Sequence, residues 1–271
     1  MNFTVVGGKG FIGSKIVEQL TSNGSNVWVP NKDDESLFSK ALGTVIYCAG
    51  HGDCEKGCLK VLQANTILLS QLVEHGNFDR LIFLSSTRVY MDQDESSENS
   101  NLTISYKDSR RLFNLSKLVA EEILLKSKKD IAIVRPSNVY GVALNSPLFL
   151  PSIARNAINN GHVDMFVSPN YAKDYVSVED VAQMTIKIAN DLSTNGQIFN
   201  VAAGFNTSAK EIAEILTDQT NCKIHWHENT QDEIFPVTDI SAIKNHFGYQ
   251  PASVLGDLAN MLSDFKRVLN K

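Results

Sequence analysis

Three glycines near the amino terminus have the spacing needed to bind a dinucleotide. Gly7, Gly10 and Gly13 form G-x-x-G-x-x-G between an apolar run at 3–6 and a helical pattern at 11–23. A pyrophosphate requires small residues there for the tight turn, for its own close approach and for packing of the helix on the strand. Backbone amides at the helix start would face the phosphates. The sequence therefore predicts a dinucleotide site at this loop.

A lysine in the helical segment FNLSKLVAEE is a second candidate for chemistry. Phe113 and Lys117 are four residues apart, so they share one face of the predicted helix. A lysine beside a large apolar side chain is either a solvated surface charge or a group held for a reaction. The residues alone leave both interpretations open.

The residues after the second predicted strand bear on the identity of the dinucleotide. An acidic residue there would bond the ribose 2′-hydroxyl of NAD, but the chain reads Pro30, Asn31 and Lys32. Lys9 in the glycine loop and Lys32 are placed to neutralise a 2′-phosphate, although both also fit ordinary surface positions. Either NADP(H) or NAD(H) fits, and the sequence slightly favours NADP(H).

Cysteines and histidines are the candidate metal ligands. Cys54 and Cys58 have C-x-x-x-C spacing with no second pair nearby, which is typical of free thiols. The stretch HWHE at 225–228 offers zinc ligands, but alternation in so short a run is more typical of a strand or loop edge. We therefore expect no metal site, and the sparse cysteines indicate a reducing, cytoplasmic compartment.

Short apolar runs alternate with helical patterns along the first half of the chain. This alternation predicts a parallel sheet covered by helices on both faces, a Rossmann-like doubly wound α/β fold. Strands are predicted at 3–6, 26–29, 44–50, 80–86 and 130–141 (the last with its exit loop), and helices at 11–23, 58–76 and 109–127.

Two departures from a regular dinucleotide fold are expected. Only 14 residues separate the strands at 26–29 and 44–50, so the second crossover is shortened and lacks a strand and a helix. Beyond residue 141 the pattern loosens. We expect a dinucleotide-binding domain over 1–141 and a smaller α/β substrate-binding region over 142–271, whose chain crosses back to the sheet. Helices are predicted near 148–160, 178–191, 207–219 and 252–269, and strands near 163–167, 197–201 and 223–226.

Composition excludes several classes of partner. The 271 residues are 43% hydrophobic and 20% charged, with a formal net charge of −5. No basic stripe is visible, which argues against nucleic acid as a partner. No apolar run is long enough to span a bilayer, and the start of the chain lacks the pattern of a signal peptide. We expect a cytoplasmic globular protein.

Several segments occur in an order that is specific to one enzyme family. They are GGKGFIG, VIYCAG, LQANTILLSQLVE, FLSSTRVY, SKLVAEE, VRPSNVYG and KDYVSVEDVA. In this order they resemble the extended short-chain dehydrogenases/reductases, which include nucleotide-sugar epimerases, dehydratases and ketoreductases. The resemblance implies an NAD(P) cofactor, a nucleotide-linked sugar as substrate, and a homodimer formed through the helices at 58–76 and 109–127.

The resemblance also assigns catalytic positions. Members use a Ser or Thr, a Tyr and a Lys, and these positions hold Ser86, Phe113 and Lys117. A phenol beside an ammonium serves as acid or base when hydride moves to or from a carbinol carbon. Phenylalanine has no proton to transfer, so the chain resembles an atypical member with altered proton transfer.

Several groups remain open as the replacement for the phenol. They are Lys117, a water, and the tyrosines Tyr90, Tyr106 and Tyr140, each of which also fits a purely packed position. The cofactor contacts that the resemblance implies lie in the glycine loop, after the second and third strands, and in the later helix. They are Gly7, Gly10, Phe11, Ile12, Gly13, Asn31, Lys32, Cys48, Ala49, Gly50 and Lys117.

Substrate-side residues match the family in part, with contacts expected from Thr87, Asn138 and Lys173. Relatives that eliminate water carry an Asp-Glu pair where this chain has Thr87 and Arg88, so reduction or epimerisation is favoured over dehydration. Asn138 matches an asparagine that contacts the sugar diphosphate. Lys173 and Gln231 stand where relatives carry phosphate-binding arginines, and lysine lacks the bidentate fork.

Two functions fit these observations. The first is an NAD(P)-dependent ketoreductase or epimerase acting at a carbinol or keto carbon of a nucleotide-linked sugar. The second is a non-catalytic dinucleotide-binding sensor, or a subunit of a sugar-modifying complex. Ser86 and Lys117 favour the enzyme, because a pure binding protein has less need of Ser86. Phe113, Gln231 and the shortened crossover favour the second function.

Overall fold

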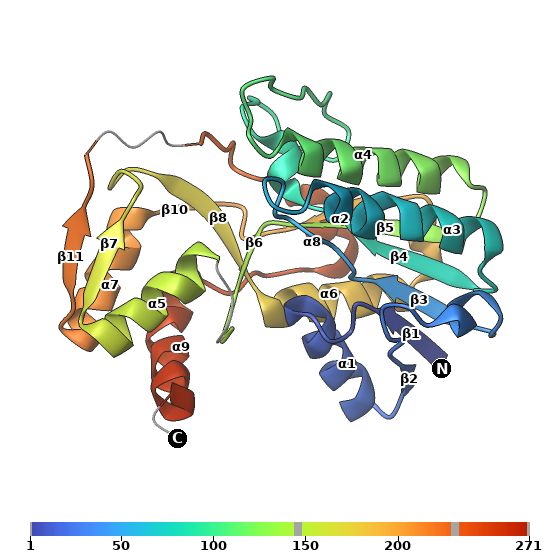
Figure 1. Ribbon diagram of the computed structural model, residues 1–271, viewed down its shortest axis with the longest axis horizontal. Helices are drawn as coiled ribbons and strands as arrows, with labels where there is room; N and C mark the ends of the chain where they lie inside the picture. The colour runs from blue at the N-terminus through green and yellow to red at the C-terminus, as the bar shows by residue number, and fades with distance from the viewer. Residues whose placement is uncertain (1, 144–147, 229–232, 270–271) are drawn as a thin grey trace. The chain divides into compact units, whose positions relative to one another are not determined.

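The computed structural model describes residues 2–143, 148–228 and 233–269 and divides into two compact units (Figure 1). Unit 1 comprises Met1–Val89, Glu98–Pro136 and Glu179–Val201. Unit 2 comprises Tyr90–Ser97, Ser137–Val178 and Ala202–Lys271. The sequence prediction placed one boundary after residue 141, whereas both units are discontinuous, because a late strand completes the sheet of unit 1.

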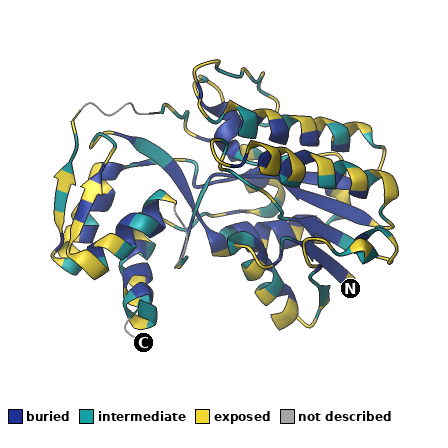
Figure 2. Cartoon of the chain, viewed as in Figure 1, coloured by how far each residue is buried: buried dark blue, intermediate teal, exposed yellow. Residues whose placement is uncertain are grey.

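Unit 1 is built on a six-stranded parallel sheet in the order β2-β1-β3-β4-β5-β9. Its central strands are buried along most of their length, as expected for a parallel sheet covered on both faces (Figure 2). This confirms the predicted Rossmann-like fold. The strands are β1 (Asn2–Val6), β2 (Asn26–Trp28), β3 (Thr44–Tyr47), β4 (Arg80–Leu84), β5 (Ile131–Pro136) and β9 (Ile198–Val201).

Helices cover both faces of this sheet (Figure 1). One face carries α1 (Phe11–Ser22) and α6 (Val178–Asn190), which are joined by an ion pair of 3.3 Å between Lys15 and Glu179. The other face carries α2 (Cys58–Leu62), α3 (Leu68–His75) and α4 (Arg111–Lys126). Buried leucines of α3 and α4 pack there against β3 and β4 in one hydrophobic cluster.

The crossover between β2 and β3 is short, as the spacing predicted. It contains a single 3₁₀ turn, Glu35–Phe38, which begins where the Asp34 carboxylate accepts a hydrogen bond from Ser36 N at 3.1 Å. No strand lies outside β2 in the described part of this sheet. Unit 1 therefore lacks the outer strand and helix of a regular dinucleotide fold.

The segment 58–76 differs from the single α-helix predicted for it. Gln63–Ile67 form a π-helical turn between α2 and α3. Two buried side chains in this turn bond to α4: Asn65 Nδ2 donates to Ser116 Oγ and Thr66 Oγ1 to the Ser116 carbonyl, both at 2.9 Å. Turns of this kind often mark functional positions.

Unit 2 contains two small sheets and several helices. Its longer predicted helices are confirmed, but all three strands of one sheet and α8 were missed. The sheets are β10-β8-β6, from Asn206–Ser208, Ala172–Ser177 and Asn138–Tyr140, and β11-β7, from Lys223–Trp226 and His162–Met165. The helices are α5 (Phe149–Asn160), α7 (Ala209–Thr220), α8 (Ser241–Phe247) and α9 (Val254–Leu269).

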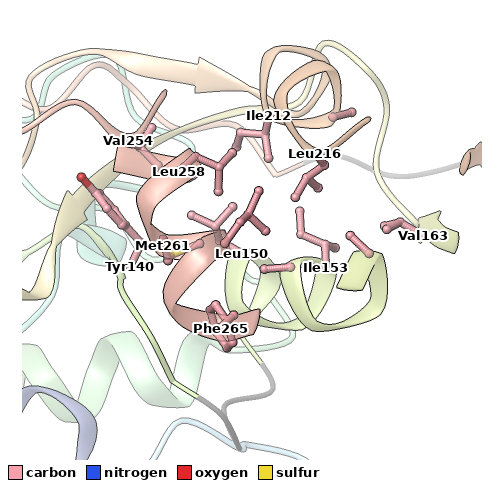
Figure 3. Packing of buried hydrophobic residues seen from close by; sticks show 14 of the residues in the cluster. Tyr140, Leu150, Ile153, Val163, Ile212, Leu216, Val254, Leu258, Met261 and Phe265 are labelled. Atoms are coloured by element: carbon pink, nitrogen blue, oxygen red, sulfur yellow. The ribbon is translucent and has the colours of Figure 1, made fainter. Parts of the chain in front are cut away.

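The core of unit 2 lies where α5, α7 and α9 meet (Figure 3). Leu150, Ile212 and Leu258, one from each helix, are at most 2% exposed. Burial of each such side chain contributes about 1.5–3 kcal/mol. Tyr140 lies at the edge of this cluster, and its hydroxyl donates to Asp257 at 2.6 Å. Within the described residues, no helix has the length and apolar character needed to cross a bilayer.

Candidate active site

The glycine loop joins β1 to α1 and leaves no room for a side chain at Gly7 or Gly13. Gly7 has a φ of +82°, and a Cβ there would lie 2.6 Å from a backbone nitrogen of the loop after β3. A Cβ on Gly13 would collide with the Gly7 carbonyl. Gly10 caps α1 without a side chain, so the first amides of the helix, at Phe11 and Ile12, lack intrahelical partners. These groups fit the pyrophosphate of a dinucleotide.

The loop after β3 forms the next part of the site. Cys48 N donates to the Val6 carbonyl at 2.8 Å and holds this loop, with Ala49, against the glycine loop. Desolvation raises the pKa of the Cys48 thiol to about 12, so the thiol is neutral. A Cβ added to Gly50 would lie 3.6 Å from Lys117 Nζ. The loop therefore leads from the glycines to the lysine.

Lys117 is buried, with 4% of the residue exposed. Its Nζ donates to the Leu84 carbonyl at 2.8 Å and lies 4.7 Å from the centre of the Phe83 ring. Burial lowers the pKa of the ammonium to about 8, and the negative charge of Glu121 opposes this shift. Lys117 is therefore not a surface charge, and its pKa suits proton exchange near neutral pH.

Phe113 lies one turn before Lys117 on α4 and is half-buried. Its ring centre is 5.9 Å from Lys117 Nζ and 5.2 Å from Arg110 Cζ. The position that would hold a phenol therefore presents an apolar ring to two cations.

Ser86 follows the end of β4 and is half-buried. Its Oγ accepts a hydrogen bond from Arg88 N at 3.1 Å. Leu84, whose carbonyl accepts the hydrogen bond from Lys117 Nζ, ends the same strand. The end of β4 thus carries Ser86 and also the acceptor that holds the lysine.

Asn65 is a further candidate for the site, and the sequence reasoning missed it. It is 0% exposed, and its Oδ1 accepts from His51 N at 3.0 Å while its Nδ2 donates to Ser116 Oγ. It therefore joins the loop after β3 to the helix that carries Lys117. The available signal was an asparagine inside the apolar helical pattern LQANTILLSQLVE.

Thr87 and Arg88, which replace the family's elimination pair, are both 7% exposed. Arg88 Nη2 donates to Asp108 at 2.8 Å, and the same carboxylate accepts from Asn114 Nδ2 at 2.9 Å. This ion pair ties the turn after β4 to the start of α4. These two positions therefore hold no acid–base pair for elimination of water.

The tyrosines considered as replacements differ in their surroundings. Tyr106 is 83% exposed and stacks against Arg111, with 4.5 Å from the ring centre to Cζ. In this conformation Tyr106 therefore does not replace the phenol beside Lys117. Tyr90 is 1% exposed, and Tyr140 belongs to the packed core of unit 2.

Lys9 and Asn31 come together across the sheet edge. Lys9 Nζ donates to Asn31 Oδ1 at 2.7 Å, which links the glycine loop to the segment after β2. Lys32 is exposed beside them in sequence. These residues occupy the place expected for contacts to the adenosine ribose.

The predicted substrate residues of unit 2 are engaged in its own structure. Asn138 Nδ2 donates to the Asp174 carbonyl at 2.8 Å and links β6 to β8. Lys173 Nζ pairs with Glu233 at 3.1 Å. The lysine at the phosphate-binding position therefore already has a carboxylate partner. Gln231 lies outside the described residues.

Comparison with known proteins identifies the family. The model of the NAD dependent epimerase/dehydratase family matches residues 3–202. A putative UDP-glucose 4-epimerase of Methanocaldococcus jannaschii is 26% identical over 256 residues, which covers 78% of this chain and 80% of that protein. Two solved structures share the fold of this chain.

The first is MoeE5 in complex with UDP-glucuronic acid and NAD, with a TM-score of 0.86, 19% identity, and coverage of 99% of this chain and 100% of that one. The second is a tyrosine-to-phenylalanine mutant of UDP-glucuronic acid 4-epimerase from Bacillus cereus, in complex with UDP-4-deoxy-4-fluoro-glucuronic acid and NAD. Its TM-score is 0.84 at 18% identity, with coverage of 99% and 100%. The matched residues and the shared fold agree with the resemblance found in the sequence. The chain belongs to the NAD-dependent epimerase/dehydratase family of extended short-chain dehydrogenases/reductases.

Proposed function

We propose that the chain binds NAD(P) in unit 1 and exchanges hydride with a carbinol or keto carbon of a nucleotide-linked sugar, as a ketoreductase or epimerase. Family membership and the glycine loop support the cofactor. The relatives named as acting on UDP-glucose or holding UDP-glucuronic acid support the substrate class. Thr87 and the paired Arg88 argue against dehydration.

The buried ammonium of Lys117 is the observation that carries this proposal. A pKa of about 8 in place of 10.5 corresponds to about 3 kcal/mol of folding free energy lost below pH 8. An exposed lysine would avoid this cost. The cost is understandable if a proton must be held close to neutral pH beside the dinucleotide.

Proton transfer would then differ from that of the family. NAD(P), when bound, supplies or accepts the hydride. The Lys117 ammonium donates a proton to the substrate oxygen during reduction, and the neutral amine accepts it during oxidation. Ser86 Oγ donates a hydrogen bond to the same oxygen. Phe113 keeps water from the lysine without taking part in the transfer.

A non-catalytic role is the second candidate. The apolar ring of Phe113 and the ion pair between Lys173 and Glu233 favour it, because both replace groups that an active relative would use. Such a protein would bind the dinucleotide and report its presence, or act as a subunit of a sugar-modifying complex.

One experiment separates these functions. The purified chain is denatured, the released nucleotide is identified, and the chain is then assayed with NADPH or NADH and a 4-keto nucleotide sugar. The enzyme is expected to oxidise the nucleotide in step with sugar reduction, or to interconvert epimers with retained NAD. The proposal would be contradicted if none of the sugar nucleotides tested bound to the chain at a concentration on the order of millimolar.

We propose a preference for NADP(H), supported by Lys9 and Lys32 near the expected ribose position. Removing both charges, in Lys9→Ala with Lys32→Ala, is expected to weaken NADPH binding about 10- to 100-fold, because hydrogen bonds to charged groups are lost. NADH binding is expected to stay within a few fold. Fluorescence titration measures both, with Lys56→Ala as a control at an exposed lysine of the same unit. Equal losses of affinity for NADPH and NADH would contradict the proposed preference for NADP(H).

We also propose a homodimer formed through the segment 58–76, which contains α2 and α3, and through α4. Leu59, Leu115 and Val119 on these helices are 77%, 44% and 48% exposed. Exposed apolar side chains on adjacent helices suit a four-helix interface between two copies. A monomeric mass in sedimentation at micromolar protein would contradict this assembly.

A further inference from the structure

Strands β7 and β11 carry polar side chains along one exposed face. The strands pair in parallel, with Lys223 opposite His162 and His225 opposite Asp164. Because successive side chains of a strand point to opposite faces of the sheet, Val163 and Met165 point inward, and both are 0% exposed. The other face therefore carries His162 and Asp164 from β7 and Lys223 and His225 from β11, and His227 follows directly after the end of β11.

Three histidines lie around the Asp164 carboxylate. His227 Nε2 lies 2.9 Å from Oδ1, and His162 Nε2 lies 3.3 Å from Oδ2. The rings of His225 and His227 meet edge to face, with 4.6 Å between their centres. One ligand atom from each of Asp164, His225 and His227 lies within 4.8 Å of the other two.

We propose that Asp164, His225 and His227 bind a divalent transition-metal ion, with Zn²⁺ as the best fit. Zinc bonds of about 2.0–2.2 Å to nitrogen and oxygen, in tetrahedral geometry, bring ligand atoms to about 3.3 Å from one another. The observed separations lie around this value, with 2.9 Å between His227 Nε2 and Asp164 Oδ1 and at most 4.8 Å among the three ligand atoms, so side-chain rotation is needed to reach it. Two imidazoles and one carboxylate suit zinc, copper or nickel, whereas Mg²⁺ and Ca²⁺ prefer oxygen ligands. A water completes the fourth position.

Neighbouring residues orient the ligands. His162 contacts the second oxygen of Asp164, which leaves Oδ1 for the metal. The Phe166 ring stacks on His227, with 4.3 Å between centres and 16° between planes. Partners of this kind fix the orientation of metal ligands and typically change affinity by about 10- to 100-fold.

An ordinary ion pair does not account for the whole cluster. An exposed pair uses one imidazole and one carboxylate and contributes at most about 1 kcal/mol. The additional imidazoles gain little from that pair, but each offers a nitrogen lone pair to a shared cation. The ion would clamp β7 to β11, which belong to segments far apart in the sequence. Such a clamp acts on unit 2 independently of the hydride chemistry proposed for unit 1.

Metal titration of the tag-free full chain tests this site. Calorimetry is expected to show one Zn²⁺ per chain, Co²⁺ to give the absorption of a four-coordinate nitrogen–oxygen site, and Zn²⁺ to raise the melting temperature. His225→Ala and His227→Ala are each expected to lower the affinity by more than about 100-fold, and His162→Ala by about 10-fold.

His75→Ala is the matched control, because His75 is an exposed histidine outside the cluster, with 61% of its side chain exposed. It should leave Zn²⁺ binding unchanged. Circular dichroism checks that every variant is folded, and Asp164→Asn provides another ligand variant if one histidine variant unfolds. Absence of Zn²⁺ binding to the folded chain, or equal affinity in the folded ligand variants, would overturn the proposal.

Discussion

Phe113→Tyr is expected to raise the rate of hydride transfer by about 10²- to 10⁴-fold. The substitution returns a phenol to a position one helical turn before Lys117, whose Nζ lies 5.9 Å from the present ring centre. The ammonium would lower the pKa of that phenol and favour proton exchange. Single-turnover oxidation of NADPH or NADH by a 4-keto nucleotide sugar measures the change without interference from product release.

Phe113→Leu is the matched control for this gain. It alters the packing beside Lys117 and adds no ionisable group, so its rate should stay near that of the unmodified chain. If Phe113→Tyr binds both ligands normally and its rate is unchanged, a phenol at residue 113 does not exchange a proton with the substrate oxygen, which would contradict the predicted gain.

Gly13→Ala is expected to abolish dinucleotide binding. The added Cβ would collide with the Gly7 carbonyl and would lie 2.9 Å from Gly8 Cα. The helix must then move away from the loop whose amides face the pyrophosphate, so the phosphate site is lost. The same collision should lower the free energy of unfolding by about 1–3 kcal/mol. Fluorescence titration and urea unfolding measure the two effects.

Gly24→Ala separates a local backbone effect from loss of the site. Gly24 has a φ of +75° with no atom within 4 Å of an added Cβ. It should therefore cost about 1 kcal/mol through backbone strain and leave dinucleotide affinity unchanged. Normal NAD(P) affinity in Gly13→Ala would show that the cofactor does not use the glycine loop.

Short-range sequence patterns predicted the parts of the fold that are determined by residues close together in the sequence. The glycines between β1 and α1, the buried strands and the amphipathic helices all follow from short-range spacing and apolar period. The short crossover after β2 followed from chain length alone. The strands β6 and β10 have three residues each, which is too short for alternation to be recognised.

Features that depend on contacts between distant residues could not be predicted. The π turn exists because Asn65 and Thr66 bond to α4, and no period in the sequence reveals that partner. The pairing of Arg88 with Asp108 and of Lys173 with Glu233 likewise joins separate segments. Asp164 meets the histidines of HWHE only through the pairing of β7 with β11. The expectation that no metal site exists rested on sequence neighbours and could not include this partner.

Lys117 illustrates both what the sequence predicts and what it cannot predict. Its position in the family pattern marked it as a candidate, but its protonation depends on burial between β4, the loop after β3 and Phe113. The sequence contains the residue, whereas the pKa of about 8 is a property of the packed site. The proposed use of this lysine as the proton donor therefore rests on the structure.

The pH dependence of single-turnover hydride transfer tests this central claim most directly. The pKa of Lys117 is lowered to about 8, so the ammonium is present below this pH and the neutral amine above it. The rate of sugar reduction should be constant below pH 8 and fall about tenfold per pH unit above it, whereas the rate of the reverse oxidation should rise about tenfold per pH unit up to pH 8 and level off above it. Lys117→Met should remove both dependences along with most of the rate. The account would be contradicted if the reduction rate stayed flat from about pH 6 to about pH 10, across the titration of Lys117, in a chain with full cofactor occupancy.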